Sequence, residues 1–270
     1  MDHYPNTISK ALFKSLIQAP PLLNDLPEAN TFPCRTLATP KDQQALNFQQ
    51  KLGHLYEDAL AVMLESTPQY DPLAKGVQIR EEAGRTLGEL DFLVKDLVSD
   101  NLIHLELAVK FYLSIEAENG FLLPGPDARD NYFRKLEKMR SHQLVLVENN
   151  RHLLPENFRA SEIIVQQLVH GCIFNHVTAD NLVEAEFLNP KGRRGKWLHA
   201  NECTDHFDKN TFFEIIPKPL WPVPLELMEN IELERWNLTE DTARCVMVRV
   251  DNLPIPYFIA PNNYPLLSSN

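Results

Sequence analysis

Hydrophobic and polar residues alternate most regularly over residues 101–112, near the middle of the chain. Successive side chains of a β-strand point to opposite faces, so this alternation predicts a strand over residues 102–112. One face of the strand would be wholly apolar and would consist of Ile103, Leu105, Leu107, Val109 and Phe111. The other face would carry His104, Glu106, Ala108, Lys110 and Tyr112. A carboxylate and an ammonium group would therefore lie on one side of a strand whose other side is built for burial.

Two shorter strands precede this one, over residues 77–82 and 87–95, and are joined by a hairpin-sized loop that contains Gly84. Asp91 lies on the second of them. Together with Glu106 and Lys110 it would converge on one face of the hairpin. Two carboxylates beside a lysine suit the binding of a hard divalent cation next to a phosphate group.

Helices are predicted before and after these three strands. Apolar residues at helical spacing predict a long helix over residues 41–65, ended by Pro68. Asp127 would be the N-cap of a second helix, which runs to about residue 147. Residues 1–40 are rich in proline and would be irregular, apart from a short amphipathic segment at 8–19. Later strands are expected at residues 163–174, 212–216 and 245–250, with a basic turn at 191–196.

This order of helix, hairpin, third strand, helix and further strand resembles the core of the PD-(D/E)XK nuclease superfamily, which has the restriction-endonuclease-like fold. That superfamily carries an aspartate near the start of one central strand and a glutamate–x–lysine motif on the next. Asp91 matches the aspartate and Glu106 the glutamate. Ala108 occupies the usual position of the lysine, and Lys110 follows two residues later. Lys110 therefore stays on the same face of the strand, displaced by roughly 6–7 Å.

A second match lies in the first long helix, where Gly53-His-Leu-Tyr-Glu57 resembles the glycine–x–x–x–glutamate pattern of the exonuclease-like branch. The pattern as a whole is also similar to a bacterial family catalogued as a domain of unknown function. The resemblance implies an α/β protein (an α+β mixed sheet), with a central mixed sheet flanked by helices. Residues 1–40 would form a Pro-rich N-terminal segment and 41–175 the nuclease-like core. Residues 176–270 would form a β-rich C-terminal extension packed on that core.

The same resemblance implies a metal-dependent nuclease that hydrolyses phosphodiester bonds. Asp91, Glu106 and Lys110 would be catalytic. Mg²⁺ (or Mn²⁺) would be bound by Asp91 and Glu106, by the backbone carbonyl of Leu107, and by Glu57 directly or through water. Nucleic acid, DNA in preference to RNA, would contact the helix after the third strand through Arg129, Arg134, Lys135, Lys138 and Gln143.

Simpler interpretations remain open beside these. Glu106 and Lys110 could form a salt bridge on a solvated face. The basic helix could likewise be a solvated surface, since Asp130 and Glu137 partly neutralise it. A protein with this fold could also have lost its chemistry through the displaced lysine. It would then be a non-catalytic module that binds nucleic acid or a protein partner.

Composition narrows the class of protein further. With 270 residues, 44% of them hydrophobic, the chain can bury a full core. Its net charge of −11 argues against a large sequence-independent basic footprint, although basic contacts can still be local. No apolar run approaches the roughly 20 residues that span a bilayer, and the first five residues lack the pattern of a signal segment. Four cysteines without a Cys-x-x-Cys pair are too sparse for a disulfide framework, so we expect a cytoplasmic protein without membrane contact.

A competing set of residues could bind zinc. Cys172 and His176 are four residues apart, as are His199 and Cys203, and two cysteines with two histidines are the ligands of many structural zinc sites. That spacing suits chelation only on helices, whereas residues 163–176 are predicted to be a strand. Core packing is the simpler explanation for these side chains. No nucleophile elbow, Walker loop or dinucleotide-binding fingerprint is present.

Overall fold

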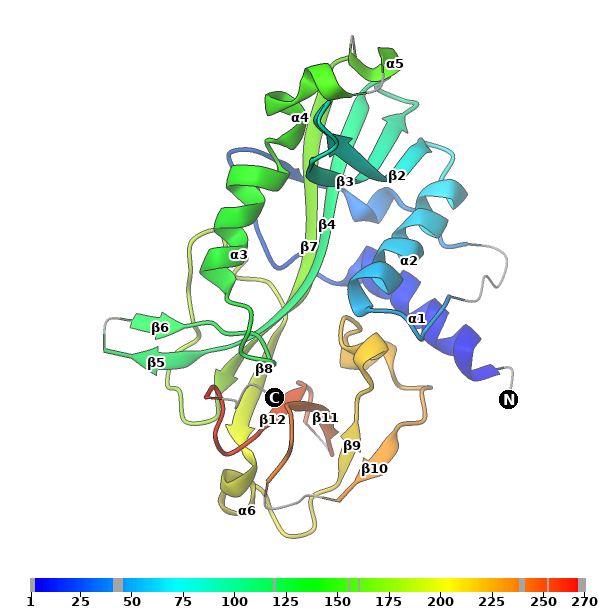
Figure 1. Cartoon of the computed structure of the whole chain (residues 1–270). Helices are drawn as coiled ribbons and strands as arrows, with labels where there is room; N and C mark the ends of the chain where they lie inside the picture. The colour runs from blue at the N-terminus through cyan, green and yellow to red at the C-terminus, as the bar shows by residue number, and fades with distance from the viewer. Residues whose placement is uncertain are drawn as a thin grey trace.

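A long mixed sheet organises the protein, and helices cover it (Figure 1). The computed structural model describes residues 3–40, 46–118, 120–154, 156–159, 161–237, 241–251 and 253–266. Ten strands form one sheet in the order β10-β9-β11-β12-β8-β7-β4-β3-β2, with β1 paired to β7 beside this path. The predicted class, an α/β protein with a mixed sheet flanked by helices, is confirmed.

The strands of this sheet have the following bounds: β1 (Asn30–Thr31), β2 (Tyr70–Arg80), β3 (Thr86–Asp96), β4 (Leu102–Leu113), β7 (Ile163–His176), β8 (Arg194–His199), β9 (Phe213–Ile215), β10 (Glu234–Trp236), β11 (Val246–Val250) and β12 (Tyr257–Ala260). A separate two-stranded sheet consists of β5 (Ile115–Ala117) and β6 (Gly120–Leu122). The α-helices are α1 (His3–Gln18), α2 (Leu52–Ser66), α3 (Tyr132–Lys138), α4 (Leu146–Asn149), α5 (Glu156–Arg159) and α6 (Cys203–His206). A π-helical turn, η2 (Met139–Gln143), and the 3₁₀ turns η1 (Cys34–Thr36), η3 (Arg151–Leu153), η4 (Ala200–Glu202), η5 (Lys218–Leu220) and η6 (Leu225–Leu227) complete the set.

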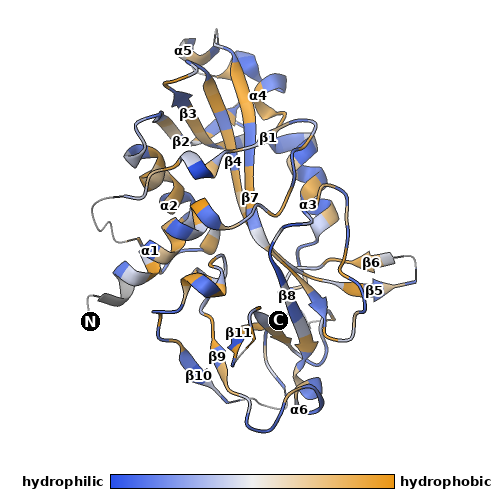
Figure 2. Cartoon of the chain, turned by 180° about the vertical axis from the view of Figure 1, so that it is seen from behind, coloured by the Kyte–Doolittle hydropathy of each residue, from blue (hydrophilic) through white to orange (hydrophobic). Residues whose placement is uncertain are grey.

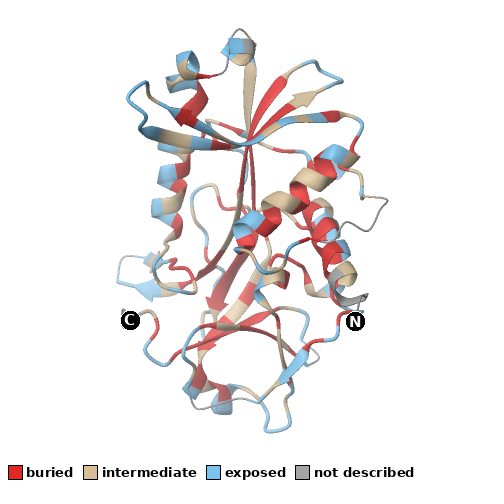
Figure 3. Ribbon diagram, turned by 45° about the vertical axis from the view of Figure 1, so that its right-hand side comes forward, coloured by how far each residue is buried: buried red, intermediate tan, exposed pale blue. Residues whose placement is uncertain are grey.

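The centre of the sheet is the pair β4 and β7, which run parallel through twelve residue pairs, from Leu102 with Ile163 to Leu113 with Phe174. Both strands are mostly hydrophobic (Figure 2) and largely buried (Figure 3). The alternation predicted for β4 is present, since Leu105, Leu107 and Phe111 all belong to the core that includes α1 and α2. Strands buried on both faces need side chains of this kind along their whole length.

The first long helix is shorter than predicted. Within the described residues, α2 begins at Leu52 instead of residue 41, and residues 41–45 lie outside the described part of the chain. The Asn47 side chain accepts a hydrogen bond of 3.0 Å from the Gln49 amide, which forms a local turn that competes with a helix. The helix ends at Ser66, two residues before Pro68, as predicted.

The N-terminal segment takes part in the fold on both faces of the sheet. The amphipathic segment expected at residues 8–19 is found as α1, a helix of 16 residues that packs beside α2 (Figure 1). The chain then passes along β7, where the Leu22 amide donates to the Val169 carbonyl at 2.6 Å. Further on, the Phe32 amide donates to the Gln167 carbonyl at 2.9 Å.

The prediction of a single helix after the third strand was wrong about where the helix starts and about its being continuous. Its N-cap is Asn131, whose side chain accepts from the Phe133 amide, and not Asp127. Asp127 instead closes a turn by accepting from the Arg129 amide at 3.1 Å. Ala128 in that turn has φ of 56°, a left-handed conformation that no helix contains. The helical segment is then interrupted by η2 before α4 begins.

The strands after residue 176 continue the central sheet. The last residue of β7, His176, pairs with Trp197 of β8, and β12 runs parallel to β8 up to the pair of Ala260 with His199. The strands predicted at residues 212–216 and 245–250 correspond to β9 and β11. The predicted basic turn at 191–196 runs into β8, whose first residues are charged and therefore gave no apolar signal. No helix in the described residues is long and apolar enough to cross a bilayer.

Candidate functional site

The sheet opens between β3 and β4 at the position of Asp91. The antiparallel ladder between these strands covers only four pairs, from Lys95 with Leu102 to Phe92 with Leu105. Beyond it, the Asp91 carboxylate accepts a hydrogen bond of 2.8 Å from the Leu107 amide. A side-chain oxygen thus replaces the backbone carbonyl that would otherwise continue the ladder. The Asp91 side chain is therefore held between the two strands, next to Leu107, which follows Glu106 in β4.

Glu106 is almost completely buried, with 1% of its surface exposed. His104 Nε2 lies 3.0 Å from one carboxylate oxygen, and Gln143 Nε2 donates to the other at 2.8 Å. His104 Nδ1 has no hydrogen-bond partner among the described residues. A neutral imidazole with its proton on Nε2 satisfies Glu106, whereas an imidazolium would bury a second N–H group without an acceptor. Each carboxylate oxygen keeps a further lone pair that could bind a cation.

Several acidic side chains surround this gap. Burial, and then repulsion from Glu106, Glu57 and Glu89, raises the pKa of Asp91 to about 8, against the opposing effect of the Leu107 amide. In the described part of the chain, no ion pair brings a lysine or an arginine to Asp91 or Glu106. Buried carboxylates without a cationic partner are what a cation site offers before the cation binds.

Glu57 approaches the same gap from α2, on the side of the helix that also carries Gly53. A Cβ atom at Gly53 would lie 4.0 Å from Glu57 Oε1, so the glycine leaves space beside this carboxylate. Glu57, Asp91 and Glu106 do not form a tight cluster. In the described residues, only His176, His199 and Glu202 bring three candidate ligand atoms within 4.8 Å of one another.

Lys110 is directed to a different partner. Its Nζ atom lies 3.3 Å from Asp130 Oδ2, and Lys135 Nζ lies 3.8 Å from the other oxygen of the same carboxylate. Lys110 is on the face of β4 that carries Glu106, as predicted from the period of the strand, but its ammonium group is held by Asp130.

The predicted nucleic-acid contacts divide into three kinds. Arg129, Arg134 and Lys138 are exposed, and Arg134 donates to the carbonyl of Arg129. Lys135 is half-buried beside Asp130. Gln143 is not free for a ligand in this structure, because it holds Glu106.

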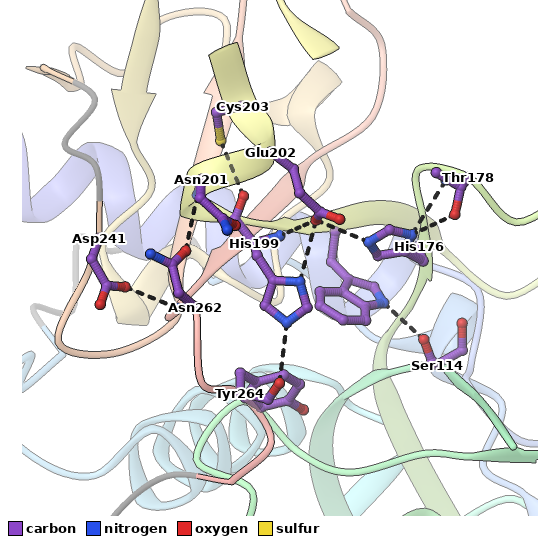
Figure 4. A network of polar contacts seen from close by, with 11 residues as sticks. Ser114, His176, Thr178, His199, Asn201, Glu202, Cys203, Asp241, Asn262 and Tyr264 are labelled. Atoms are coloured by element: carbon purple, nitrogen blue, oxygen red, sulfur yellow. Dashed lines mark hydrogen bonds and ion pairs between the residues drawn. The ribbon is translucent and has the colours of Figure 1, made fainter. Parts of the chain in front are cut away.

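Figure 4 shows a second group of polar side chains. Two of its histidines are candidate ligands predicted from the sequence. The candidate ligand atoms of His176, His199 and Glu202 lie together, whereas neither thiol of the alternative zinc set, Cys172 or Cys203, is among them. Cys172 is fully buried in the main core. Cys203 packs in another apolar cluster and donates from Sγ to the His199 carbonyl at 3.6 Å. Glu202 was missed, although its position three residues after His199 suits a contact within one helical turn.

Fold and site together describe an α/β protein with acidic side chains at the point in a mixed sheet where the ladder between β3 and β4 ends. The model of one protein family, described as "Domain of unknown function (DUF1853)", matches residues 13–252. The chain belongs to this family. No curated protein and no solved structure is significantly similar to it.

The raised pKa of Asp91 predicts an unusual dependence of stability on pH. The folded protein keeps a proton on Asp91 up to about pH 8, whereas the unfolded chain releases it near the ordinary value of 3.8. The unfolded state therefore binds fewer protons between these values, and the free energy of unfolding should fall as pH rises from about 4 to 8. Urea unfolding in the presence of a chelator, compared between wild type and Asp91→Asn, measures this contribution.

In Asp91→Asn, the free energy of unfolding should depend less on pH between about pH 4 and 8. Asp71→Asn, which changes an exposed residue of β2, should leave this dependence as in wild type. Identical profiles for wild type and Asp91→Asn would show that Asp91 does not hold a proton in this range.

Proposed function

We propose that this protein is a metal-dependent nuclease that hydrolyses phosphodiester bonds of nucleic acid, with Mg²⁺ or Mn²⁺ bound at the opening between β3 and β4. The observation that carries this proposal is a pair of acidic side chains, buried Glu106 and half-buried Asp91, to which no lysine or arginine is ion-paired among the described residues. Asp91, with its raised pKa, keeps a proton up to about pH 8, and ionising both groups would place two negative charges here. Burying such charge is costly unless a cation accompanies it. Oxygen ligands alone are the set that Mg²⁺ and Mn²⁺ prefer.

The ligands would be Asp91, Glu106 and the carbonyl of Leu107, with Glu57 acting through water. The Leu107 amide points at Asp91. In a strand, the N–H and C=O groups of one residue point to the same side, since paired residues exchange both bonds. The Leu107 carbonyl therefore faces the same opening. His104 and Gln143 fix the orientation of the Glu106 carboxylate, as the outer partners of metal ligands commonly do.

A bound Mg²⁺ would supply Lewis-acid stabilisation of the phosphate and make an attacking water more acidic. The exposed side chains Arg129, Arg134 and Lys138 would hold neighbouring phosphates of the nucleic acid, for which we propose DNA in preference to RNA. The element order α2, β2, β3, β4, α3, β7 is the one expected for the PD-(D/E)XK superfamily. It supports membership of that superfamily as part of this proposal.

Lys110 would orient the water or offset charge on the phosphate in the transition state. For this role its ammonium group must exchange Asp130 for the substrate. The pair is partly exposed, with 30% and 23% of the two side chains accessible. Ion pairs of this kind contribute little, typically about 0–1 kcal/mol, so a phosphate can compete with Asp130 for Lys110.

The decisive experiment is a cleavage assay on single- and double-stranded DNA and RNA with Mg²⁺ or Mn²⁺. Wild type should cleave at least one substrate, and Lys110→Ala should lower the rate by about 10²–10³-fold while keeping substrate affinity, because it removes stabilisation of the transition state alone. The double variant with Ala108→Lys and Lys110→Ala should recover part of the activity, since both positions face the same side of β4.

The second candidate function is a non-catalytic module that binds nucleic acid or a protein partner. The specific observation that favours it is the Lys110–Asp130 ion pair, which leaves the carboxylates without a neighbouring lysine. Wild type that binds nucleic acid and cleaves none of the four substrates with either cation would establish this alternative and remove the nuclease proposal.

A further inference from the structure

His176, His199 and Glu202 meet where parallel strands end. His176 is the last residue of β7 and His199 the last of β8, and Glu202 ends the 3₁₀ turn η4 that follows β8. The adjacent strand β12 ends opposite His199, and the carbonyl of Tyr264 returns to this point (Figure 4). Ligands commonly bind beyond the carboxyl ends of parallel strands, because several chain segments place side chains there.

The spacing of the three side chains matches a small coordination site. His176 Nε2 lies 3.1 Å and His199 Nδ1 3.2 Å from the same oxygen of Glu202. Four ligands at the Zn–N distance of about 2.0–2.1 Å lie about 3.3 Å from one another at the corners of a tetrahedron. The two separations from Glu202 therefore require only small shifts to admit a zinc ion, and all three ligand atoms lie within 4.8 Å of one another.

The hydrogen bond to Tyr264 determines which nitrogen of His199 can be a ligand. A carbonyl oxygen can only accept, so His199 Nε2, 3.1 Å from the Tyr264 carbonyl, must carry a proton. In a neutral ring, Nδ1 then presents a lone pair towards Glu202. A Glu202 carboxylate oxygen lies 3.2 Å from Nδ1, and the Glu202 amide also donates to the His199 side chain. A metal ion bound here would take the place of that amide contact.

The surroundings keep both imidazole rings in place. His176 Nδ1 has two contacts with Thr178, the hydroxyl Oγ1 at 2.7 Å and the backbone amide, which donates to it at 3.4 Å. With Nε2 as a metal ligand, Nδ1 would carry the proton and donate to Oγ1, and the longer amide contact would be given up. The ring of His176 packs edge-on against Trp197, with 4.7 Å between centroids. The indole N–H of Trp197 is anchored in turn on the Ser114 carbonyl at 2.8 Å. The rings are thus oriented before any ligand arrives.

We propose that His176 Nε2, His199 Nδ1 and the Glu202 carboxylate bind one Zn²⁺ ion, with a fourth position open to solvent. Two imidazoles and one carboxylate favour zinc over Mg²⁺, and three protein ligands with an open position are typical of zinc sites that bind a further molecule. The side chains are 20%, 24% and 39% exposed, so the ion could enter. This site is separate in its residues from the carboxylates between β3 and β4.

The rival explanation is structural. His199 and Glu202 form a capping box at the start of η4, in which the Glu202 carboxylate accepts from the His199 amide at 2.7 Å and the His199 side chain accepts from the Glu202 amide. Such a box needs no metal, but it does not involve His176. A variant of His176 therefore tests metal binding without removing the cap.

The experiment is a calorimetric titration of the chelator-treated full chain with ZnCl₂, with melting temperature as a second measurement. Wild type should bind one Zn²⁺ per chain and melt at a higher temperature when loaded. His176→Gln and His199→Ala should weaken binding by more than about 100-fold, since loss of an outer partner alone costs 10–100-fold. His152→Ala, which changes an exposed histidine of η3, should bind as wild type does.

Asp91→Asn should also retain full zinc affinity, which separates this site from the proposed nuclease site. Cys203→Ser should behave like wild type, because the thiol faces an apolar cluster. The proposal is overturned if wild type binds no zinc, or if His176→Gln, with an unchanged circular dichroism spectrum, binds as tightly as wild type. It is overturned equally if a correctly folded Cys203→Ser loses the ion.

Discussion

Glu106→Gln is expected to fold normally and to lose cation-dependent cleavage of nucleic acid by about 10³-fold or more. The amide has nearly the volume of the carboxylate, and Gln143 can turn its own amide over to accept from the new N–H₂ group. Both hydrogen bonds of the buried side chain are then kept. The proposed metal ligand loses its charge, and under the proposed nuclease function a bound cation would contribute several kcal/mol, at about 1.4 kcal/mol for each tenfold change in rate.

The measurement is the initial rate of cleavage at saturating substrate with Mn²⁺, together with urea unfolding of both proteins. Glu232→Gln is the matched control, because it makes the same chemical change at an exposed residue between β9 and β10. Its rate should equal that of wild type. A Glu106→Gln protein that cleaves at the wild-type rate would exclude Glu106 as a metal ligand and would leave it as a buried residue held by His104 and Gln143.

Gly171→Ala is expected to destabilise the protein by more than about 4 kcal/mol, or to prevent folding. Gly171 pairs with Lys110 across the two central strands and has φ of 155°. A Cβ atom built there would lie 1.7 Å from the Lys110 carbonyl oxygen and 2.7 Å from its carbon. Because the clash is with backbone, it can be relieved only by separating β4 from β7. The midpoint of urea unfolding, or the yield of folded protein, measures the loss.

Gly84→Ala provides the comparison. Gly84 also has a positive φ, of 86°, but nothing lies within 4 Å of the added Cβ in the loop between β2 and β3. The only cost there is that alanine disfavours a positive φ, which should lower the free energy of unfolding by roughly 1–2 kcal/mol. Equal losses for the two variants would mean that the close approach of β4 to Gly171 does not constrain the fold.

The local pattern of apolar residues was sufficient to predict the central strands. The alternation over residues 102–112 predicted β4 to within one residue at its end, and the apolar run at 163–174 predicted most of β7. Both signals are local, because period two and β-branched residues act within one strand. The starts of α2 and α3 were not visible, because turns at Asn47 and Ala128 precede these helices and apolar spacing does not report such turns.

Contacts between distant side chains could not be predicted in the same way. The sequence suggested that Asp91 and Glu106 would face one side of the sheet, but not that Asp91 would bond the Leu107 amide where β3 leaves β4. Gln143, which bonds Glu106, is the last residue of η2, where the helical segment is interrupted. The partner of Lys110 was likewise unpredicted, since Asp130 is twenty residues away and was read as a solvated charge.

By itself, the sequence determined the class of fold, the position of the main strands and the residues on the polar face of β4, because hydrophobic periodicity is encoded within each element. The tertiary structure alone decided which polar groups meet. His176 and His199 come together with Glu202, and not with the cysteines, because β7 and β8 pair in parallel with His176 opposite Trp197. That register depends on the packing of both strands against the whole sheet, and no local pattern in either segment records it.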